Sequence, residues 1–171
     1  MGDARDSRTP VVCDTCVLVN FVRVERVELL ERHARFRFVV PEQVLDEVAH
    51  PLQRASIDAA MARGGLELVV SSDLAEITAA AQLRLTLGRG EAVAIAVAHA
   101  RGWCIATDEL RRTRRVVVER LGEQRLLTTP GILLTSIRAG QLTVDEADRI
   151  KQRLEALRFR MSFDSFGELL P

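Results

Sequence analysis

The sequence has no tyrosine, only three cysteines and no long apolar run among its 171 residues. A segment that crosses a bilayer needs about 18 or more consecutive apolar residues, so we expect no membrane anchor. The first nine residues, MGDARDSRT, are polar and mixed in charge, and they lack the apolar centre of a secretory signal. These absences predict a cytoplasmic protein. An odd number of cysteines in such a protein argues against a disulfide framework.

Net charge of either sign is also missing, because 24 basic side chains balance 24 acidic ones. A neutral chain has no general attraction for nucleic acid, so any nucleic-acid site has to be a local patch. Lys151 is the only lysine, and arginine supplies every other basic residue. The planar guanidinium suits phosphate, but GC-rich coding also raises arginine content, and the composition leaves both explanations open.

Short apolar runs rich in β-branched residues alternate with stretches of helical periodicity. Apolar strands separated by helices are typical of a parallel sheet covered on both faces, so we predict an α/β fold. The predicted strands are residues 11–13, 36–40, 66–70, 103–106 and 125–128. The predicted helices between them are residues 15–24, 25–34, 41–50, 52–63, 73–86, 90–101 and 108–121.

No linker or repeat divides the chain, and we therefore expect a single domain over residues 1–171. Its α/β core covers about residues 10–128, and a helical extension covers about residues 129–171, with helices at 130–139 and 144–157. The pair Thr143 and Glu146 forms a capping box that marks the start of the second of these helices. The tail, FRMSFDSFGELLP, holds three of the six phenylalanines, and we expect it to dock onto the domain.

Acidic side chains occur where predicted strands end and helices begin. Asp14 and Asp108 each follow a strand, Glu47 lies on the helix after the second strand, and Glu91 lies in the first turn of an alanine-rich helix. In open parallel sheets ligands collect at the carboxyl ends of the strands. Four carboxylates at one edge would repel one another unless cations were present, and oxygen ligands without histidine favour Mg²⁺ or Mn²⁺ over zinc. Ordinary helix caps and exposed ion pairs are the alternative.

The cysteines and histidines suggest no site of their own. Cys13 and Cys16 have the spacing of half a zinc site or of a redox pair, but Cys104 stands alone and no second ligand pair follows. We expect Cys13 and Cys104 to pack in neighbouring buried strands as small apolar residues. The three histidines are scattered along the chain, and we expect them at the surface or at its boundary; they are His33, His50 and His99.

Arginines gather after Asp108 on a predicted helix. Their positions allow a solvated face that pairs with Glu119 and Glu123, or a patch that holds RNA phosphates beside the acidic residues. Arg89, which precedes Glu91 in a glycine-containing turn, would join such a patch. The candidate phosphate-binding residues are Arg89, Arg111, Arg112, Arg114 and Arg115.

Four segments together resemble the PIN-domain family, the fold of metal-dependent ribonucleases that includes VapC-type toxins. They are VVCDTCVLVNF, VPEQVLDEV, LGRGEAVAIAVA and CIATDELRR, in family order over roughly residues 10–120. The segments GILLTSIRAGQLT and LEALRFRMS resemble a bacterial PIN-like branch that is mostly uncharacterised. The resemblance implies a PIN-like, three-layer α/β/α fold with a central parallel sheet of about five strands and added C-terminal helices.

The resemblance also implies which residues form the site. Asp14, Glu47, Glu91 and Asp108 match the acidic metal-binding and catalytic positions, and Glu109 matches a further position where many relatives carry aspartate. Thr15 and Thr107 match the hydroxyl-bearing neighbours of those acids. Family members often carry serine or asparagine where this chain has Cys16, which predicts that one polar contact beside the acids is missing.

The function implied by the resemblance is that of an endoribonuclease that hydrolyses RNA with Mg²⁺ or Mn²⁺ and leaves a 5′-phosphate. The expected partners are the RNA substrate, a second copy of the chain in a homodimer, and a small antitoxin that inhibits a type II toxin. An RNA-binding or regulatory module with weak or no catalysis is the alternative, favoured by Cys16 and Glu109. A receiver-like signalling domain fits poorly, because it needs a lysine directly after the fifth strand and the only lysine, Lys151, lies in a late predicted helix.

Overall fold

A parallel sheet forms the centre of the computed structural model, which describes residues 6–171, so residues 1–5 of the predicted domain lie outside it. Within the described residues the sheet has five strands in the order β3-β2-β1-β4-β5, and all neighbouring pairs are parallel. The strands are β1 (Thr9–Cys13), β2 (Phe36–Pro41), β3 (Glu67–Val69), β4 (Cys104–Ala106) and β5 (Leu126–Leu127). The predicted α/β class and the five predicted strands are confirmed.

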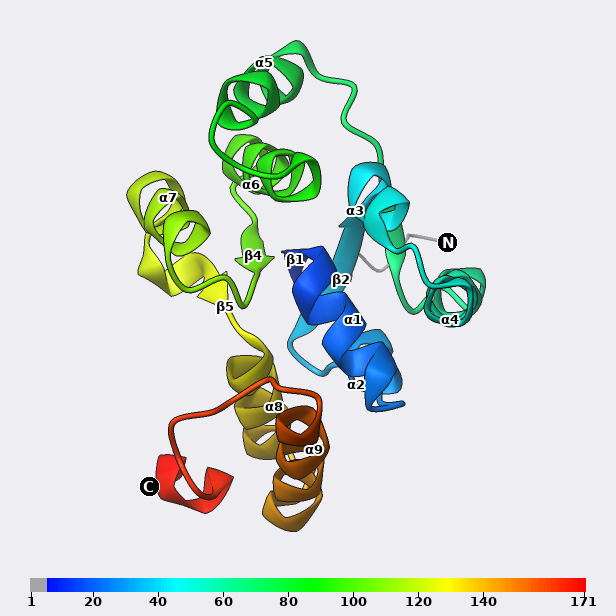
Figure 1. The fold of residues 1–171 in the computed structure, drawn as a ribbon, viewed down its shortest axis with the longest axis vertical. Coiled ribbons are helices and arrows are strands. Elements are labelled where there is room, and N and C mark those ends of the chain that lie inside the picture. The colour runs from blue at the N-terminus through cyan, green and yellow to red at the C-terminus, as the bar shows by residue number, and fades with distance from the viewer. Residues whose placement is uncertain (1–5) are drawn as a thin grey trace.

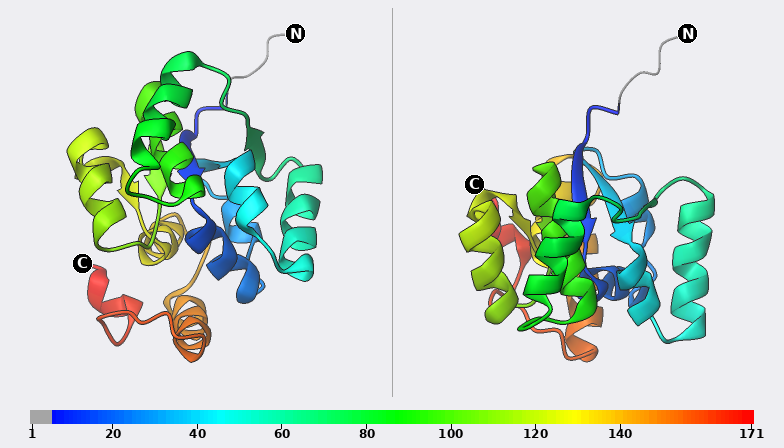
Figure 2. Two further views of the ribbon diagram at one scale, coloured as in Figure 1. Left: turned by 45° about the horizontal axis from the view of Figure 1, so that its top comes forward. Right: turned by 90° about the horizontal axis from the view of Figure 1, so that it is seen from above.

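Alternating residues of the strands pack into two separate apolar cores. In β1, Val11 and Cys13 enter one core while Val12 enters the other, as the two-residue period of a strand requires. Figures 1 and 2 show α5 and α6 on one side of the sheet and α1 and α2 on the other, which gives the expected three layers. The helices of the domain core are α1 (Thr15–Arg23), α2 (Glu28–Glu31), α3 (Glu42–Glu47), α4 (Pro51–Ala62), α5 (Leu74–Leu83), α6 (Arg89–Arg101) and α7 (Arg112–Leu121).

The C-terminal part packs on the α1 side of the sheet. A 3-10 turn at Glu123–Arg125 precedes β5, and α8 (Thr129–Arg138), α9 (Val144–Ala156) and a second 3-10 turn (Phe166–Leu169) follow it. The predicted capping box at α9 is present, since Glu146 N–H donates to Thr143 Oγ1 and Thr143 N–H donates to Glu146 Oε2. The tail docks as expected, with Phe166 fully buried in the same core as α8 and α9.

Three local expectations are wrong. The predicted helix at 25–34 shrinks to α2 because Glu25 takes a left-handed conformation, with φ of 56°, that breaks the helical run. The helix predicted from residue 108 begins only at Arg112, and residues 108–111 form the turn that leaves the sheet. His33 is buried rather than at the boundary: its Nδ1 accepts hydrogen bonds from two backbone N–H groups, and its ring lies 4.8 Å from that of Phe36.

The strand order reverses direction at the β1–β4 junction. The chain runs outward from β1 through β2 to β3, then returns to place β4 on the other side of β1. Such a reversal opens a crevice at the carboxyl ends of the two central strands. Asp14 and Asp108 lie at this point, because Cys13 is paired in register with Ala106. No helix in residues 6–171 is long and apolar enough to span a membrane.

Candidate active site

Asp14 is the most enclosed acid of the site. Its backbone continues from β1, and its side chain caps α1 by accepting a hydrogen bond of 2.8 Å from Thr15 N–H, an arrangement that satisfies a free donor of the helix. The second oxygen accepts from Thr107 Oγ1 at 3.0 Å. The side chain is 3% exposed, and burial, with a smaller contribution from the charge of Glu91, raises its pKa above the ordinary value. A cation beside Asp14 would offset this cost of burying its charge.

Asp108 lies across the β1–β4 junction from Asp14 and is held by the start of α8. Thr129 donates to it twice, from N–H at 2.7 Å and from Oγ1 at 2.5 Å, and Asn20 of α1 donates from Nδ2 at 3.0 Å. Burial raises the pKa of Asp108, and the hydrogen bonds from Thr129 and Asn20 work in the opposite direction. The carboxylate is therefore fixed by α1 and α8 together.

Glu91 of α6 and Glu47 of α3 lie at the opposite side of the pocket from Asp108. Glu91 is the third residue of α6, where it accepts from Gly88 N–H at 3.0 Å and from Thr113 Oγ1 at 2.8 Å. Glu47 ends α3 and accepts from Thr15 Oγ1 at 2.7 Å and from Gly90 N–H at 2.6 Å. A Cβ at Gly90 would lie 2.5 Å from Glu47 Oε2, so glycine there is what allows this close approach.

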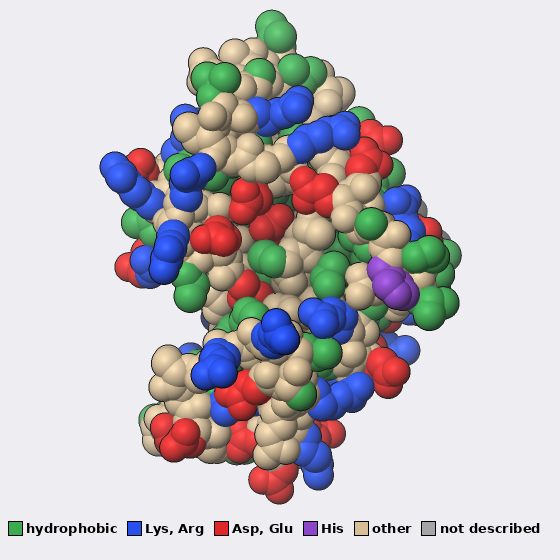
Figure 3. Space-filling model, in the orientation of Figure 1, with side chains coloured by type: hydrophobic (Ala, Val, Ile, Leu, Met, Phe, Trp, Pro, Cys, Tyr) green, Lys and Arg blue, Asp and Glu red, His purple; other side chains and the backbone are tan. Residues whose placement is uncertain are grey.

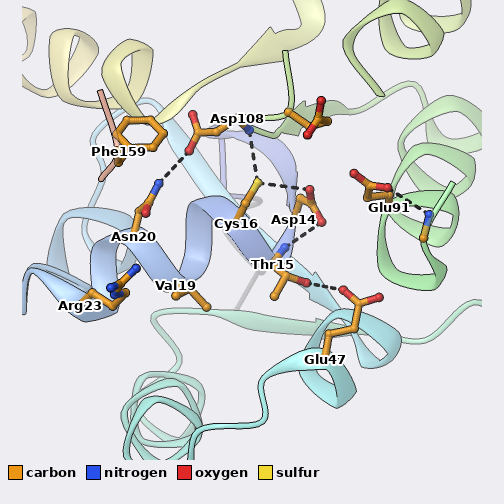
Figure 4. A pocket seen from close by; sticks show the side chains of 12 residues that line it. Asp14, Thr15, Cys16, Val19, Asn20, Arg23, Glu47, Glu91, Asp108 and Phe159 are labelled. Carbon is orange, nitrogen blue, oxygen red and sulfur yellow. Dashed lines mark hydrogen bonds between the residues drawn. The ribbon is translucent and has the colours of Figure 1, made fainter. Parts of the chain in front are cut away.

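The four predicted acids line one open pocket of about 620 Å³. Figure 4 shows their side chains entering it from four different elements. Every oxygen of the four carboxylates accepts at least one hydrogen bond from a protein N–H, O–H or S–H group. An oxygen with one such bond keeps a lone pair for another partner, and metal-binding carboxylates are commonly held by hydrogen bonds of this kind.

The four acids offer the ligand atoms that a hard divalent cation prefers, but their side chains are too far apart to bind one ion together. All four candidate ligands offer carboxylate oxygens, which Mg²⁺ and Mn²⁺ prefer. Across residues 6–171, no three histidine, cysteine, aspartate or glutamate side chains converge closely enough to hold one metal ion. The structure thus presents four oriented carboxylates around a pocket, rather than a closed coordination sphere.

Cys16 lies where the resemblance to the PIN-domain family predicted that a polar contact is missing. Its thiol donates to Asp14 Oδ2 at 3.3 Å and accepts from Asp108 N–H at 3.3 Å. Burial, assisted by the charge of Asp14, raises the pKa of Cys16 to about 12, so the group stays a neutral thiol. The contact expected to be lost is therefore made by sulfur, and Cys16 bridges the two aspartates.

Glu109 and the five predicted arginines lie around the pocket with different neighbours. Glu109 lines the pocket and accepts from Arg111 N–H at 3.1 Å. Arg114 pairs with Glu123 and Arg115 with Glu119, as the solvated-face interpretation predicted. Figure 3 shows acidic side chains in a central hollow with basic side chains on both sides.

Of the remaining three predicted arginines, two lie beside the carboxylate pocket and the third pairs with an acid outside it. Arg111 and Arg112 line a second pocket that shares Glu91 and Glu109 with the first. Arg112 donates to the Thr86 carbonyl at 2.8 Å. Arg89 lies 3.5 Å from Asp46 at the start of α6. Of the five, Arg111 and Arg112 are therefore the ones placed beside the carboxylate pocket.

Several residues of the site were missed in the sequence. Thr113 and Thr129 hold Glu91 and Asp108, and Asn20 holds Asp108. Asn20 follows Cys16 by one helical turn, a spacing that places both on one helix face and that would have pointed to it. Arg23 and Phe159 also line the pocket, and no sequence pattern marks Phe159.

A comparison with protein families extends the similarity over almost the whole chain. A family model described as a PIN domain matches residues 10–171. The match includes α8, α9 and the C-terminal tail as well as the α/β core. No curated protein matches the sequence.

Proposed function

The chain belongs to the PIN-domain family, whose members are generally nucleases, and from this premise we propose that it is an endoribonuclease dependent on Mg²⁺ or Mn²⁺. The observation that carries the proposal is the convergence of Asp14, Glu47, Glu91 and Asp108 on one open pocket. Their separation along the chain is large, and carboxylates that meet around the junction of β1 and β4 repel one another unless a cation is bound. Divalent metals are typical of PIN domains.

The roles of the residues follow from their positions. Asp14, Glu47, Glu91 and Asp108 would hold the cation, with Glu109 at the rim as a further ligand. A bound divalent cation would lower the pKa of an attacking water and stabilise charge on the phosphate. Thr15 orients Glu47, and Thr107 orients Asp14, through their hydroxyl hydrogen bonds. The exposed Arg111 and Arg112 would bind phosphates beside the reacting one.

We further propose that the protein is the toxin of a type II toxin–antitoxin pair, a homodimer in the cytoplasm that a small antitoxin inhibits. Support for a protein partner comes from α5 and the turn after it, where Leu74 is 78% exposed and Leu85 is 85% exposed, with Ile77 also half exposed. Exposed large apolar side chains in a group are typical of protein interfaces. A second copy and an antitoxin would compete for this surface or share it.

The test is cleavage of a fluorogenic single-stranded RNA by the purified protein with Mg²⁺, with Mn²⁺ or with a chelator. Asp14→Asn should lower the rate more than about 100-fold, since removing even a supporting partner of a metal ligand costs 10- to 100-fold. Asp58→Asn is the matched control, because Asp58 forms only an exposed pair with Arg54 on α4 and such pairs contribute little. Equal cleavage by wild type and Asp14→Asn would refute the site.

An RNA-binding module without turnover is the second candidate. The observation in its favour is that each oxygen of the four carboxylates already accepts a hydrogen bond from the protein. Within the described residues, no three of these acids lie close enough together to hold one metal ion. RNA binding that persists while no metal supports cleavage would favour this candidate over the enzyme.

A further inference from the structure

One aromatic side chain lines the carboxylate pocket among the described residues, and the proposed hydrolysis does not need it. Phe159 comes from the tail after α9, is only partly buried, and borders the same pocket as Asp108 and Asn20. Figure 4 shows Phe159, Asn20 and Arg23 on one side of the pocket and Glu47 and Glu91 on the other. The pocket thus has two glutamates on one side, and on the other an aromatic ring and a cation together with Asp108.

The backbone fixes Phe159 in this place. Helix α9 ends at Ala156, and Arg158, two residues further on, takes the left-handed conformation with φ of 70°, although glycine is the usual residue there. Arg158 N–H donates to the Glu155 carbonyl at 2.9 Å, and Phe159 N–H donates to the Leu154 carbonyl at 2.9 Å. This pair of bonds is the Schellman motif. The ring packs partly against the core and turns its remaining surface to the pocket.

Arg23 supplies a positive charge at the same side. It is the last residue of α1 and is exposed. Within residues 6–171 its guanidinium makes no ion pair and no hydrogen bond, unlike Arg26, Arg114 and Arg115, which all pair with glutamates. A cation without a partner beside an aromatic surface is the combination that binds single-stranded nucleic acid, with the base on the ring and the phosphate on the arginine.

We propose that Phe159 and Arg23 form a subsite for one unpaired nucleotide next to the phosphate that is cleaved. The subsite rests on the proposed ribonuclease function for its position relative to the cleaved bond. A base in a duplex is stacked on both faces and is not available to Phe159. The pocket volume of about 620 Å³ lies within the roughly 300–1,000 Å³ of sites for small ligands, enough for one nucleotide.

The binding test uses a 5′-fluorescein single-stranded RNA and fluorescence anisotropy, with Ca²⁺ in place of Mg²⁺. Phe159→Leu should weaken binding at least about 5-fold, the lower end expected for loss of one base–aromatic stack, and Phe159→Trp should retain it. Phe163→Leu is the matched control, since Phe163 lies on the same tail but packs edge-on against Phe166 at 4.9 Å and does not line the pocket. Equal losses for Phe159→Leu and Phe163→Leu would overturn the subsite.

Two further measurements separate stacking from packing. RNA with an abasic position beside the cleaved phosphate should bind wild type as weakly as normal RNA binds Phe159→Leu, and Phe159→Leu should no longer distinguish the two RNAs. Arg23→Gln should lower the salt dependence of binding by about 0.7 in log–log slope, the value for one phosphate contact with a single strand. Arg153→Gln, which removes an arginine already paired with Glu25, should leave that slope unchanged.

The outcomes distinguish the subsite from the ribonuclease function. Binding that depends on Phe159 without any cleavage would support the subsite and reject the enzyme. Cleavage that is equal for Phe159→Leu and Phe163→Leu, on single-stranded and duplex RNA alike, would support the enzyme and reject the subsite. Failure of wild type to bind single-stranded RNA more tightly than the matching duplex would also reject the subsite.

Discussion

Replacing Thr129 with valine removes one hydroxyl from the network that holds Asp108 and keeps the shape of the side chain. The Thr129 Oγ1 bond to Asp108 Oδ2 is 2.5 Å long and partly buried, with the Thr129 side chain itself buried, while the bonds to Asp108 from Thr129 N–H and from Asn20 remain. A hydrogen bond to a charged group contributes about 1.5–3 kcal/mol. At about 2–4 °C per kcal/mol for a domain of this size, the metal-free Tm should fall by roughly 3–12 °C.

The same substitution should weaken Mn²⁺ binding about 10- to 100-fold, because partners that orient metal-binding groups have effects of this size. Both quantities can be measured in one assay, as the Tm of the protein with chelator and over a Mn²⁺ titration. Thr135→Val on the same helix is the control: its hydroxyl donates to the Gly131 carbonyl at 2.7 Å, a neutral bond worth about 0.5–1.5 kcal/mol. Wild-type Mn²⁺ affinity in Thr129→Val would refute the assigned role of Thr129.

Two other predictions concern the carboxylates directly. Gly90→Ala should lower RNA cleavage at least about 10-fold with little change in Tm, because its Cβ would displace Glu47 while alanine favours the helix; Gly131→Ala, whose Cβ meets nothing nearer than 3.4 Å, should leave cleavage unchanged. For Asp14, burial raises the folded-state pKa above its ordinary value of 3.8, so the folded chain holds this proton to higher pH than the unfolded chain. In urea unfolding with chelator, the free energy of unfolding of wild type should fall relative to that of Asp14→Asn as the pH rises from the unfolded-state pKa of Asp14 to its folded-state pKa. A difference in unfolding free energy that does not change with pH would contradict the burial of a charge at Asp14.

The parts of the fold that the sequence predicts are those set by local patterns. Mostly apolar runs of three to five residues marked the strands, and the capping pair Thr143 and Glu146 marked α9. Boundaries failed where a single backbone conformation decides them. Glu25, at φ of 56°, interrupts a helical pattern, although nothing about a glutamate side chain predicts this conformation. Residues 108–111 connect β4 to α7 as a turn beside the site, although their sequence pattern predicted a helix.

Asp14, Glu91 and Asp108 were predictable as candidates because each follows a strand or begins a helix, and Glu47 because it lies on the helix after the second strand. The side chains that hydrogen-bond to these acids could not be predicted, because they are distant in sequence. Asn20 is 88 residues from Asp108, and Thr113 is 22 residues from Glu91. Such pairs depend on the packing of α1, α7 and α8 against the sheet. For the same reason the pattern could not show that the thiol of Cys16 would contact both aspartates.

The burial of His33 and of Phe159 also could not be predicted from the sequence. A histidine with no patterned partner was expected near the surface, yet its Nδ1 accepts two backbone N–H groups in the core. Phe159 belongs to a tail that was expected only to dock, yet part of its ring borders the pocket. Burial and exposure at these positions follow from how the C-terminal helices fold back onto the domain.

The central claim is that the carboxylates at the β1–β4 junction bind a divalent cation. Electron paramagnetic resonance of free Mn²⁺ during titration into the metal-free protein measures this directly, without any assumption about the substrate. Wild type and Asp58→Asn should bind Mn²⁺ saturably, and Asp14→Asn and Asp108→Asn should bind it at least about 100-fold more weakly. Equal Mn²⁺ binding by all four proteins would contradict the claim.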